Sequence, residues 1–243
     1  LALAARERGL VRKNVGLGRS APRLEAARDA GVIDDFATDP AVLGEADLVI
    51  VCTPVDRVAE DVLTAARHSP QDAVITDVGS TKRGIVEAVL ADPDAAAKYV
   101  PAHPLAGSEQ RGYEAAAANL FDSRLCVLTP VPQTDPARLE KVESFWQAIG
   151  MRTARLSPAE HDEILAVTSH LPHVAAAALA RLVSDRERPL TATGFRDTTR
   201  IAGGDAALWT AILLENVGPL QAALGRLADE LAALGEPAGV DAG

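Results

Sequence analysis

The sequence is poor in aromatic residues, cysteine and positive charge. Of its 243 residues only 3% are aromatic, two are cysteines, and 24 Lys and Arg stand against 34 Asp and Glu, for a formal net charge of −10. An acidic chain repels nucleic-acid backbones and anionic membrane surfaces. We therefore expect neither as a partner, and expect a small polar substrate. With 48% hydrophobic residues the chain can bury a core, as a soluble globular protein does.

Two features of the sequence indicate a reducing, cytoplasmic compartment: the placement of its cysteines and its lack of long apolar runs. Cys52 and Cys126 lie far apart in apolar stretches, which gives neither a disulfide framework nor a metal site. We expect both to be buried thiols in a reducing compartment. No apolar run approaches the ~20 residues that cross a bilayer, and residues 1–10 are too charged for a signal peptide or anchor. The sequence thus predicts a cytoplasmic protein with neither a membrane span nor a bound metal.

The start of the chain lacks two expected features. There is no initiator Met, and residues 1–8 have the pattern of a helix that ends at Gly9. The G-x-G-x-x-G turn that holds the pyrophosphate in dinucleotide-binding sheets is also absent. The first strand is central in such a sheet, so its loss would leave backbone groups of both neighbours unpaired. We therefore expect the sequence to be part of a longer protein.

Between Val15 and Arg155 short β-rich runs alternate with helical stretches. This alternation is typical of βαβ units that build a parallel sheet. The clearest predicted strands, 47–52 and 73–76, each lead through a loop into a helix, and ligands bind at that carboxyl edge of an open α/β sheet. The sequence predicts a doubly wound, Rossmann-like α/β domain over residues 1–156. Further strands are expected at 99–102, 125–128 and 152–156, and a further helix at 136–149.

A second, all-α domain is expected over residues 157–243, because long helices without strand signals follow Ser157. Ser157-Pro-Ala-Glu is a capping box, which predicts a helix from there to about Ser184. Asp205 is placed to cap a later helix. The Ala/Leu-rich segment 220–234 has the period of an amphipathic helix that packs against a partner subunit. We therefore expect a homodimer formed through this domain.

The segment 15–20 has the form of a strand end that binds the adenosine ribose of a dinucleotide. Enzymes that use NAD place an acidic residue there, whereas an arginine suits the 2′-phosphate of NADP. Gly18 stands where the acidic residue of an NAD enzyme would be, and Arg19 and Ser20 follow it, which favours NADP over NAD. Arg19 can equally be a solvated surface charge. The loops after the two clearest strands supply the other candidate cofactor contacts: Thr53, Pro54, Asp77 and Gly79.

Two loops could carry chemistry. Residues 77–82 can be a plain turn in which Ser80 is a helix N-cap, or can contribute to a site. His103 lies between prolines and before a Gly turn, so it is held rigidly at the carboxyl edge of the sheet. A lone histidine is more often structural than catalytic, but this placement favours function.

The helical region offers two further polar groups. Asp162, Ser169 and His173 share one stripe of a helix, which forms either a solvated face or the wall of a polar cleft. Arg196 and Arg200 lie near a helix break. Arginine binds carboxylates in a bidentate manner, although a local pair with a neighbouring aspartate is the alternative.

Four motifs occur in a fixed order along the chain. They are 77–82 (DVGSTK), 103–109 (HPLAGSE), 169–173 (SHLPH) and 194–202 (GFRDTTRIA), with Trp209 following. Together they resemble the prephenate and arogenate dehydrogenases of tyrosine biosynthesis, and the resemblance covers nearly the whole chain. It implies a metal-independent oxidative decarboxylation with NAD or NADP, of prephenate to 4-hydroxyphenylpyruvate or of arogenate to tyrosine.

The resemblance also implies roles for individual residues. His103 matches the catalytic histidine, which bonds the substrate hydroxyl and draws its proton as hydride departs. Ser80 matches a serine that bonds this histidine or the hydroxyl beside the nicotinamide. Arg200 matches the arginine that binds the substrate carboxylate. The other implied substrate contacts are His173, Ser108, Trp209 and, at the pocket entrance, Asp162.

Two alternatives remain open at this stage. A β-hydroxyacid dehydrogenase also joins a nucleotide-binding sheet to a helical domain, but it would place a lysine on the first long helix, and residues 157–181 contain none. A non-catalytic dinucleotide-binding sensor or dimerisation scaffold would explain the missing glycine turn. The sequence does not decide between prephenate and arogenate.

Overall fold

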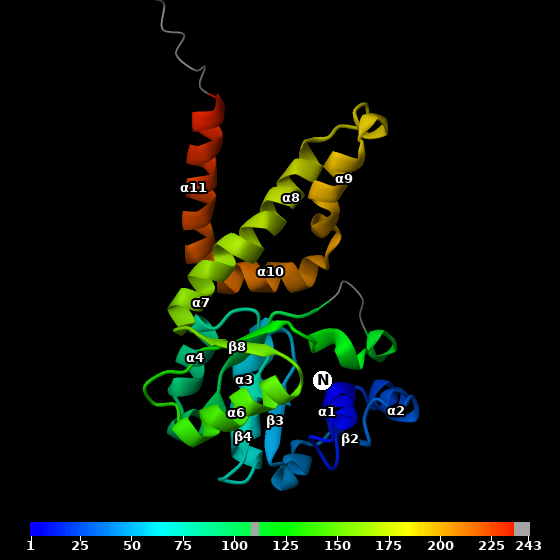
Figure 1. The fold of residues 1–243 in the computed structure, drawn as a ribbon, viewed down its shortest axis with the longest axis vertical. Helices are drawn as coiled ribbons and strands as arrows, with labels where there is room; N and C mark the ends of the chain where they lie inside the picture. The colour runs from blue at the N-terminus through cyan, green and yellow to red at the C-terminus, as the bar shows by residue number, and fades with distance from the viewer. Residues whose placement is uncertain (108–111, 236–243) are drawn as a thin grey trace, which may run out of the picture. The chain divides into compact units, whose positions relative to one another are not determined.

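The computed structural model describes residues 1–107 and 112–235, which belong to two compact units, Leu1–His161 and Asp162–Gly243 (Figure 1). Unit 1 is the α/β unit and unit 2 is helical. The strands of unit 1 are β1 Val15–Leu17, β2 Asp35–Ala37, β3 Leu48–Val51, β4 Val74–Asp77, β5 Tyr99–Val100, β6 Ala102–Pro104, β7 Leu125–Leu128 and β8 Arg152–Arg155. Its α-helices are α1 Ala2–Glu7, α2 Ala21–Asp29, α3 Val55–His68, α4 Arg83–Leu90, α5 Pro93–Lys98 and α6 Pro136–Ala148. Its short 3₁₀ turns are Pro40–Glu45, Tyr113–Ala115 and Ala118–Phe121.

The strands of unit 1 pair in three ladders. β1 pairs with β2, and β3, β4 and β5 form a second ladder, all in parallel. In the third ladder β7 pairs in parallel with β8 but antiparallel with β6. The expectation of a purely parallel sheet is therefore wrong at β6. The connection from β6 to β7 carries 3₁₀ turns where a parallel pair needs a crossover, so the chain can return in the opposite direction.

The expected strand 99–102 is also divided. Residues 99–100 pair with β4, whereas residues 102–104 pair with β7, and Pro101 separates the two ladders. Proline has no backbone N–H to continue a ladder, which accounts for the break at this residue. The division matters for the site because it places His103 opposite Val127 of β7.

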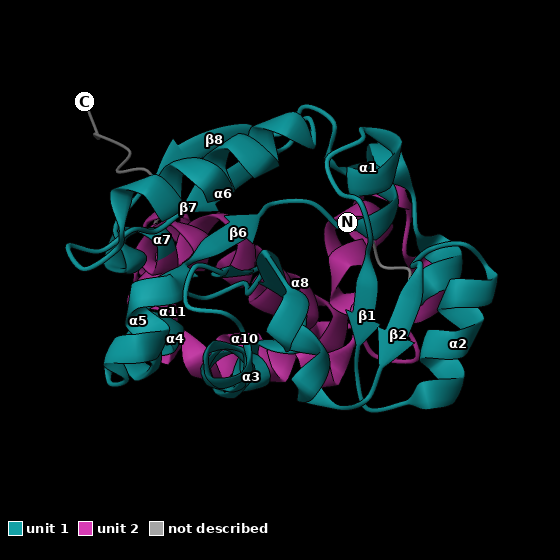
Figure 2. Ribbon diagram, turned by 90° about the horizontal axis from the view of Figure 1, so that it is seen from below, with its two compact units in different colours: residues 1–161 teal, residues 162–243 magenta. Residues whose placement is uncertain are grey.

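The core of unit 1 lies between its strands and helices. The helix α3 turns Val58 and Val62 inward and contacts β4, whose four residues are all buried. The helix α6 lies next to β8 (Figure 2) and also contacts β5 and β4, with Trp146 fully buried in the same cluster as Leu128. Burial of apolar surface is the main favourable term in folding. The strand ends and their loops are thus carried on a packed framework.

The two cysteines have different environments. Cys126 is buried within β7, and burial raises the pKa of its thiol to about 12. Cys52 is exposed, so the expectation of a buried thiol is wrong there. The reason is its position one residue beyond Val51, the last paired residue of β3, where the chain has already left the ladder.

Unit 2 begins within a long helix. This helix is α7, Pro158–Leu165, whose first residues up to His161 belong to unit 1. The elements that follow in unit 2 are a π-helical turn Ala166–His170, α8 Leu171–Leu182, a 3₁₀ turn Arg188–Leu190, α9 Thr193–Thr199, a 3₁₀ turn Arg200–Gly203, α10 Ala206–Glu215 and α11 Val217–Gly235. The capping box is confirmed, because the Ser157 N–H donates to the Glu160 carboxylate (2.8 Å) and the Glu160 N–H donates to the Ser157 hydroxyl (3.2 Å). Asp205 caps α10 by accepting from the Leu208 N–H at 2.7 Å. Pro172 lacks the N–H that a regular helix needs, and the π-helical turn precedes it.

The helix Pro158–Leu182 contradicts one expectation from the sequence, the absence of a long apolar stretch. Within the described residues it is the helix long and apolar enough to cross a membrane by length and composition, with a mean hydropathy of 1.2 over 18 residues. The expectation that no stretch approaches such a length is therefore wrong. Four of its polar side chains, His161, Asp162, His170 and His173, are nevertheless buried in the protein. These side chains mark the part of the helix that packs inside the protein, and 28% of the 18-residue window is buried.

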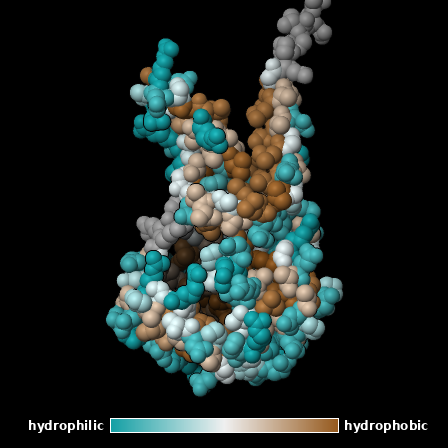
Figure 3. Space-filling view, turned by 180° about the vertical axis from the view of Figure 1, so that it is seen from behind, coloured by the Kyte–Doolittle hydropathy of each residue, from teal (hydrophilic) through white to brown (hydrophobic). Residues whose placement is uncertain are grey.

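Large apolar side chains remain exposed on the helices of unit 2. Figure 3 shows this surface in brown. The side chains come from several helices and from one connecting turn. The exposed residues are Ile164, Val167, Leu179, Leu182, Leu190, Leu208, Leu214, Val217, Leu231 and Leu234. Exposed apolar side chains in such number are typical of protein interfaces.

We predict that Trp146→Ala lowers the free energy of unfolding by about 3–5 kcal/mol, because it removes a fully buried ring and leaves a cavity. Urea unfolding followed by circular dichroism measures the change. Trp146→Phe is the control: it keeps a ring and removes an indole N–H that has no partner among the described residues, so it should cost less. A loss below about 1 kcal/mol for the alanine variant would contradict this account of the core.

Candidate active site

The loop between β4 and α4 is built around the carboxylate of Asp77, the last residue of β4. Oδ2 accepts from the Gly79 N–H at 2.8 Å and pairs with Lys82 Nζ at 2.5 Å. Oδ1 accepts from the Tyr99 hydroxyl at 2.8 Å and from the Ala102 N–H at 3.2 Å. Asp77 and Lys82 are both fully buried. Burial, together with the negative charge of Asp77, raises the pKa of Tyr99 well above its ordinary value.

Glycine is required at position 79. A Cβ there would lie 2.8 Å from Asp77 Oδ2 and 3.1 Å from Lys82 Nζ. The next residue, Ser80, is half-buried and is not a helix N-cap, because α4 begins at Arg83 and Lys82 occupies the cap position. The interpretation of Ser80 as a cap is therefore wrong. The ion pair with Asp77 holds Lys82 ahead of the first helical turn, so the helix starts after it.

His103 forms a histidine pair with His161. His103 Nδ1 lies 2.9 Å from His161 Nε2, with the rings edge to face at a centroid distance of 5.1 Å. His103 is 8% exposed on β6, and His161 is 0% exposed in the first turn of α7. Sequence reasoning did not single out His161. The only local signal was its place directly after the capping box, where its N–H donates to the Ser157 carbonyl at 3.0 Å.

The loops expected to contact a dinucleotide follow strand ends in unit 1. Thr53 and Pro54 are exposed after β3, and Gly79 and Ser80 follow β4. β3 and β4 are adjacent and parallel, and their last residues pair with one another, so these two loops leave the same edge of the ladder. Arg19 and Ser20 are exposed between β1 and α2.

His173 and Trp209 stack in unit 2. Their ring centroids are 3.6 Å apart and the planes are 10° from parallel. Gly204 packs against this pair, since a Cβ there would lie 2.6 Å from Trp209 Nε1. Burial lowers the pKa of His173, opposed by a hydrogen bond to the Ile201 backbone. The His173 ring is therefore held neutral more readily than a solvated imidazole.

The polar stripe of the long helix faces inward in part. Asp162 and His173 are buried, so the alternative of a solvated face is wrong for these two residues, while Ser169 is half-buried. The Asn216 side-chain amide donates to the Asp162 carbonyl at 2.7 Å, and its Nδ2 lies 3.1 Å from His170 Nδ1. Asn216, which lies between α10 and α11, thus ties this junction to the Asp162 backbone and to His170.

The remaining predicted substrate contacts are Arg200 and Ser108. Arg200 is exposed at the start of a 3₁₀ turn, in keeping with its place beside a helix break. Ser108 lies outside the described residues.

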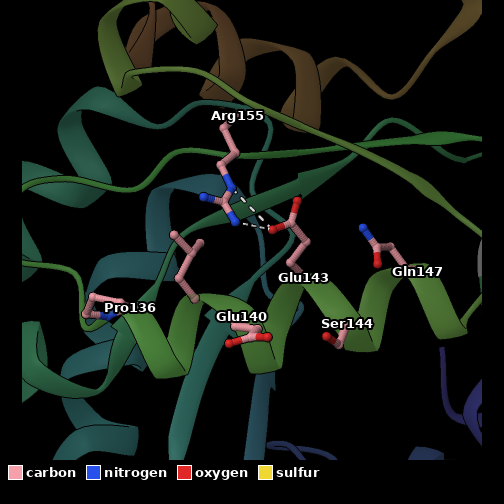
Figure 4. A pocket seen from close by; sticks show the side chains of 7 residues that line it. Pro136, Glu140, Glu143, Ser144, Gln147 and Arg155 are labelled. Atoms are coloured by element: carbon pink, nitrogen blue, oxygen red, sulfur yellow. Dashed lines mark hydrogen bonds and ion pairs between the residues drawn. The ribbon is translucent and has the colours of Figure 1, made fainter.

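A groove along α6 holds none of the predicted site residues. Figure 4 shows it, with the Arg155 guanidinium directed at the Glu143 carboxylate. This hydrogen bond lowers the pKa of Glu143. The groove is lined by Pro136, Leu139, Glu140, Glu143, Ser144, Gln147 and Arg155. It therefore belongs to the outer surface of α6 and β8 and not to the candidate site.

We predict that Gly79→Ala lowers the free energy of unfolding by about 1–3 kcal/mol, because the added methyl overlaps the buried Asp77–Lys82 pair. Urea titration gives the value. Gly44→Ala is the matched control, since its nearest neighbour, the His68 carbonyl, is 3.9 Å away and the change should be small. Equal stability of the two variants would show that the loop has room at position 79.

Two family models match the chain. "Prephenate dehydrogenase, nucleotide-binding domain" matches residues 1–155, and "Prephenate dehydrogenase, dimerization domain" matches residues 157–237. Among curated proteins, prephenate dehydrogenase of Bacillus subtilis is 37% identical over an alignment of 228 residues that covers 89% of this chain. The chain spans 60% of the length of that relative.

Solved structures of prephenate and arogenate dehydrogenases are also similar to this chain. A. aeolicus prephenate dehydrogenase, in complex with hydroxyphenyl propionate and NAD+, has a TM-score of 0.89 and 31% identity, with 96% of this chain and 84% of that chain covered. Synechocystis arogenate dehydrogenase has a TM-score of 0.82 and 29% identity, with 96% and 86% covered.

Proposed function

The chain belongs to the prephenate dehydrogenase family, and from this we propose that it catalyses the NAD- or NADP-dependent oxidative decarboxylation of prephenate to 4-hydroxyphenylpyruvate in tyrosine biosynthesis. The observation that carries the proposal is the buried His103, fixed on β6 beside the loop that follows β4. Arogenate, which would give tyrosine, is the second candidate substrate. The likeness to an arogenate dehydrogenase of known structure supports it.

In this proposal His103 is the general base. It takes the proton of the substrate hydroxyl while the hydrogen on the same carbon leaves as hydride. A bound nicotinamide supplies the acceptor for this hydride. The ring carboxylate then leaves as carbon dioxide, and the electron pair of the broken bond makes the ring aromatic. Ser80 bonds His103 or the hydroxyl from the adjoining loop.

Apart from Ser108, the other substrate contacts are assigned to unit 2. Arg200 binds a substrate carboxylate, because a protein with a net charge of −10 needs local positive charge to attract a dianion. The stacked His173 and Trp209 supply a ring surface and a polar edge. Asp162 borders the pocket, and Ser108 completes this set of assigned contacts.

The cofactor assignment rests on loops of unit 1, the nucleotide-binding part of the chain. The exposed Arg19 and Ser20 offer a guanidinium and a hydroxyl, a donor set that suits the 2′-phosphate of NADP. We infer that NADP is preferred, with NAD as the alternative. Thr53, Pro54 and Gly79 contact the dinucleotide, and Asp77 shapes the loop from inside through its buried carboxylate.

We further propose that the protein is a cytoplasmic homodimer formed through unit 2, without nucleic-acid or membrane partners. The match of residues 157–237 to a dimerization domain and the exposed apolar side chains of unit 2 support the dimer. We place the domain division at residues 156 and 157, where the two family models meet. The helix that follows has no lysine between residues 157 and 181, which disfavours a β-hydroxyacid dehydrogenase.

We predict that His103→Ala lowers turnover by about 10²-fold or more, as expected for the loss of a general base. Reduced-nicotinamide absorbance measures it, in the chain as given and with a first strand and glycine-rich turn placed before Leu1. His68→Ala, a change of an exposed histidine, is the control and should retain turnover. Unchanged turnover in His103→Ala, with circular dichroism matching the unmodified protein, would sink the assignment of His103.

We predict that Arg19→Ala weakens NADP binding by about tenfold or more while NAD binding changes little, because a charge-assisted contact to the 2′-phosphate is lost. Calorimetric titration with both dinucleotides measures the ratio. Arg12→Ala, whose side chain is 96% exposed, is the control for a general charge effect. An equal loss for both cofactors would refute this role for Arg19.

A further inference from the structure

We propose that His161 is a positioning residue, which sets the tautomer and the ring orientation of His103. The inference rests on the proposed function in one respect, namely that His103 is the base. The pair itself is a feature of the fold: two buried imidazoles whose Nδ1 and Nε2 atoms lie 2.9 Å apart.

The geometry requires a defined proton between the two rings. A neutral imidazole has one N–H donor and one bare acceptor nitrogen, so the contact uses the donor of one ring and the acceptor of the other. If His103 Nδ1 donates to His161 Nε2, then Nε2 of His103 is the acceptor, which a general base needs. In the opposite arrangement Nε2 of His103 would carry a proton and could not accept one.

The two rings are anchored by independent elements. The backbone of His103 is held in β6, opposite Val127, and its neighbour Ala102 donates to the Asp77 carboxylate. His161 is held in the first turn of α7 through its bond to the Ser157 carbonyl. The contact between them therefore fixes the His103 ring within its strand. Precise placement of this kind is what proton transfer from a bound substrate demands.

The contact between the two rings also responds to the arrival of the proton. When His103 accepts a proton at Nε2, its Nδ1–H becomes the donor of an ionised group, and the hydrogen bond to neutral His161 strengthens. This gain is made only as the proton arrives, so it contributes to the reacting state more than to the resting one. His161 thus acts through His103 and has no contact of its own with substrate in this proposal.

Nitrogen NMR of the histidine rings tests the proposal without depending on activity. The chain has five histidines, and the His103 signals are assigned by comparison with His103→Asn. We expect Nδ1 of His103 to carry the proton in the unmodified protein. His161→Phe, which keeps a ring and removes the acceptor, should abolish this fixed tautomer. His161→Gln, whose carbonyl reaches the position of Nε2, should restore it, and the exposed-site control His68→Gln should leave it unchanged.

Kinetics give the second measurement. We expect kcat to fall about tenfold or more in His161→Phe with little change in KM, and to recover in His161→Gln. A proton on Nε2 of His103 in the unmodified protein would overturn the proposal, and this result needs no variant to fold. An unchanged His103 tautomer in His161→Phe would also overturn it.

The two proposals fail separately. If the expected ring spectra are found but neither prephenate nor arogenate is turned over, the positioning role stands and the proposed function fails. If the unmodified protein is active and His161→Phe matches it in both spectrum and kcat, the positioning role fails and the function stands.

Discussion

The buried carboxylate of Asp77 connects the parts of unit 1 on which the candidate site depends. One oxygen holds the loop after β4 through the Gly79 N–H and Lys82, and the other holds Tyr99 and the backbone immediately before His103. A carboxylate buried with these donors is stable only while all of them remain in place. The loop assigned to the cofactor and the strand assigned to the base are therefore fixed by one group, and their separation is set before any ligand binds.

A second connection holds the same strand within unit 1. The capping box at Ser157 starts α7 in a defined position. His161, four residues after Ser157, is thereby placed against His103. Within unit 2 the buried Asn216 fixes Asp162 and His170, and Gly204 admits the stacked pair of His173 and Trp209. In both units, side chains with assigned chemistry are held by buried polar groups and by glycines that leave no room for a methyl group. This arrangement is the preorganisation that general-base catalysis requires.

Local features of this protein were predictable from its sequence, whereas contacts between distant segments were not. The strands near 47–52 and 125–128, helix α6 and the cap at Ser157 follow from periodicity and capping chemistry, which act over a few residues. Tertiary packing decides the other features: β6 and β7 pair antiparallel, Cys52 is exposed, and Lys82 forms an ion pair with Asp77. His161 was missed for the same reason, since its partner is 58 residues away in the chain. The motifs located the loops of the site, and only the fold shows which side chains hold them.

The central claim is that this family member oxidises and decarboxylates a cyclohexadienyl substrate with a nicotinamide cofactor. The most direct measurement follows reduced-nicotinamide absorbance with prephenate and arogenate, each with NAD and with NADP, using the chain preceded by a first strand and a glycine-rich turn. The account predicts turnover in at least one pairing, with carbon dioxide released in equal amount to the reduced cofactor. No turnover in any of the four, from a folded protein that binds a dinucleotide, would contradict it.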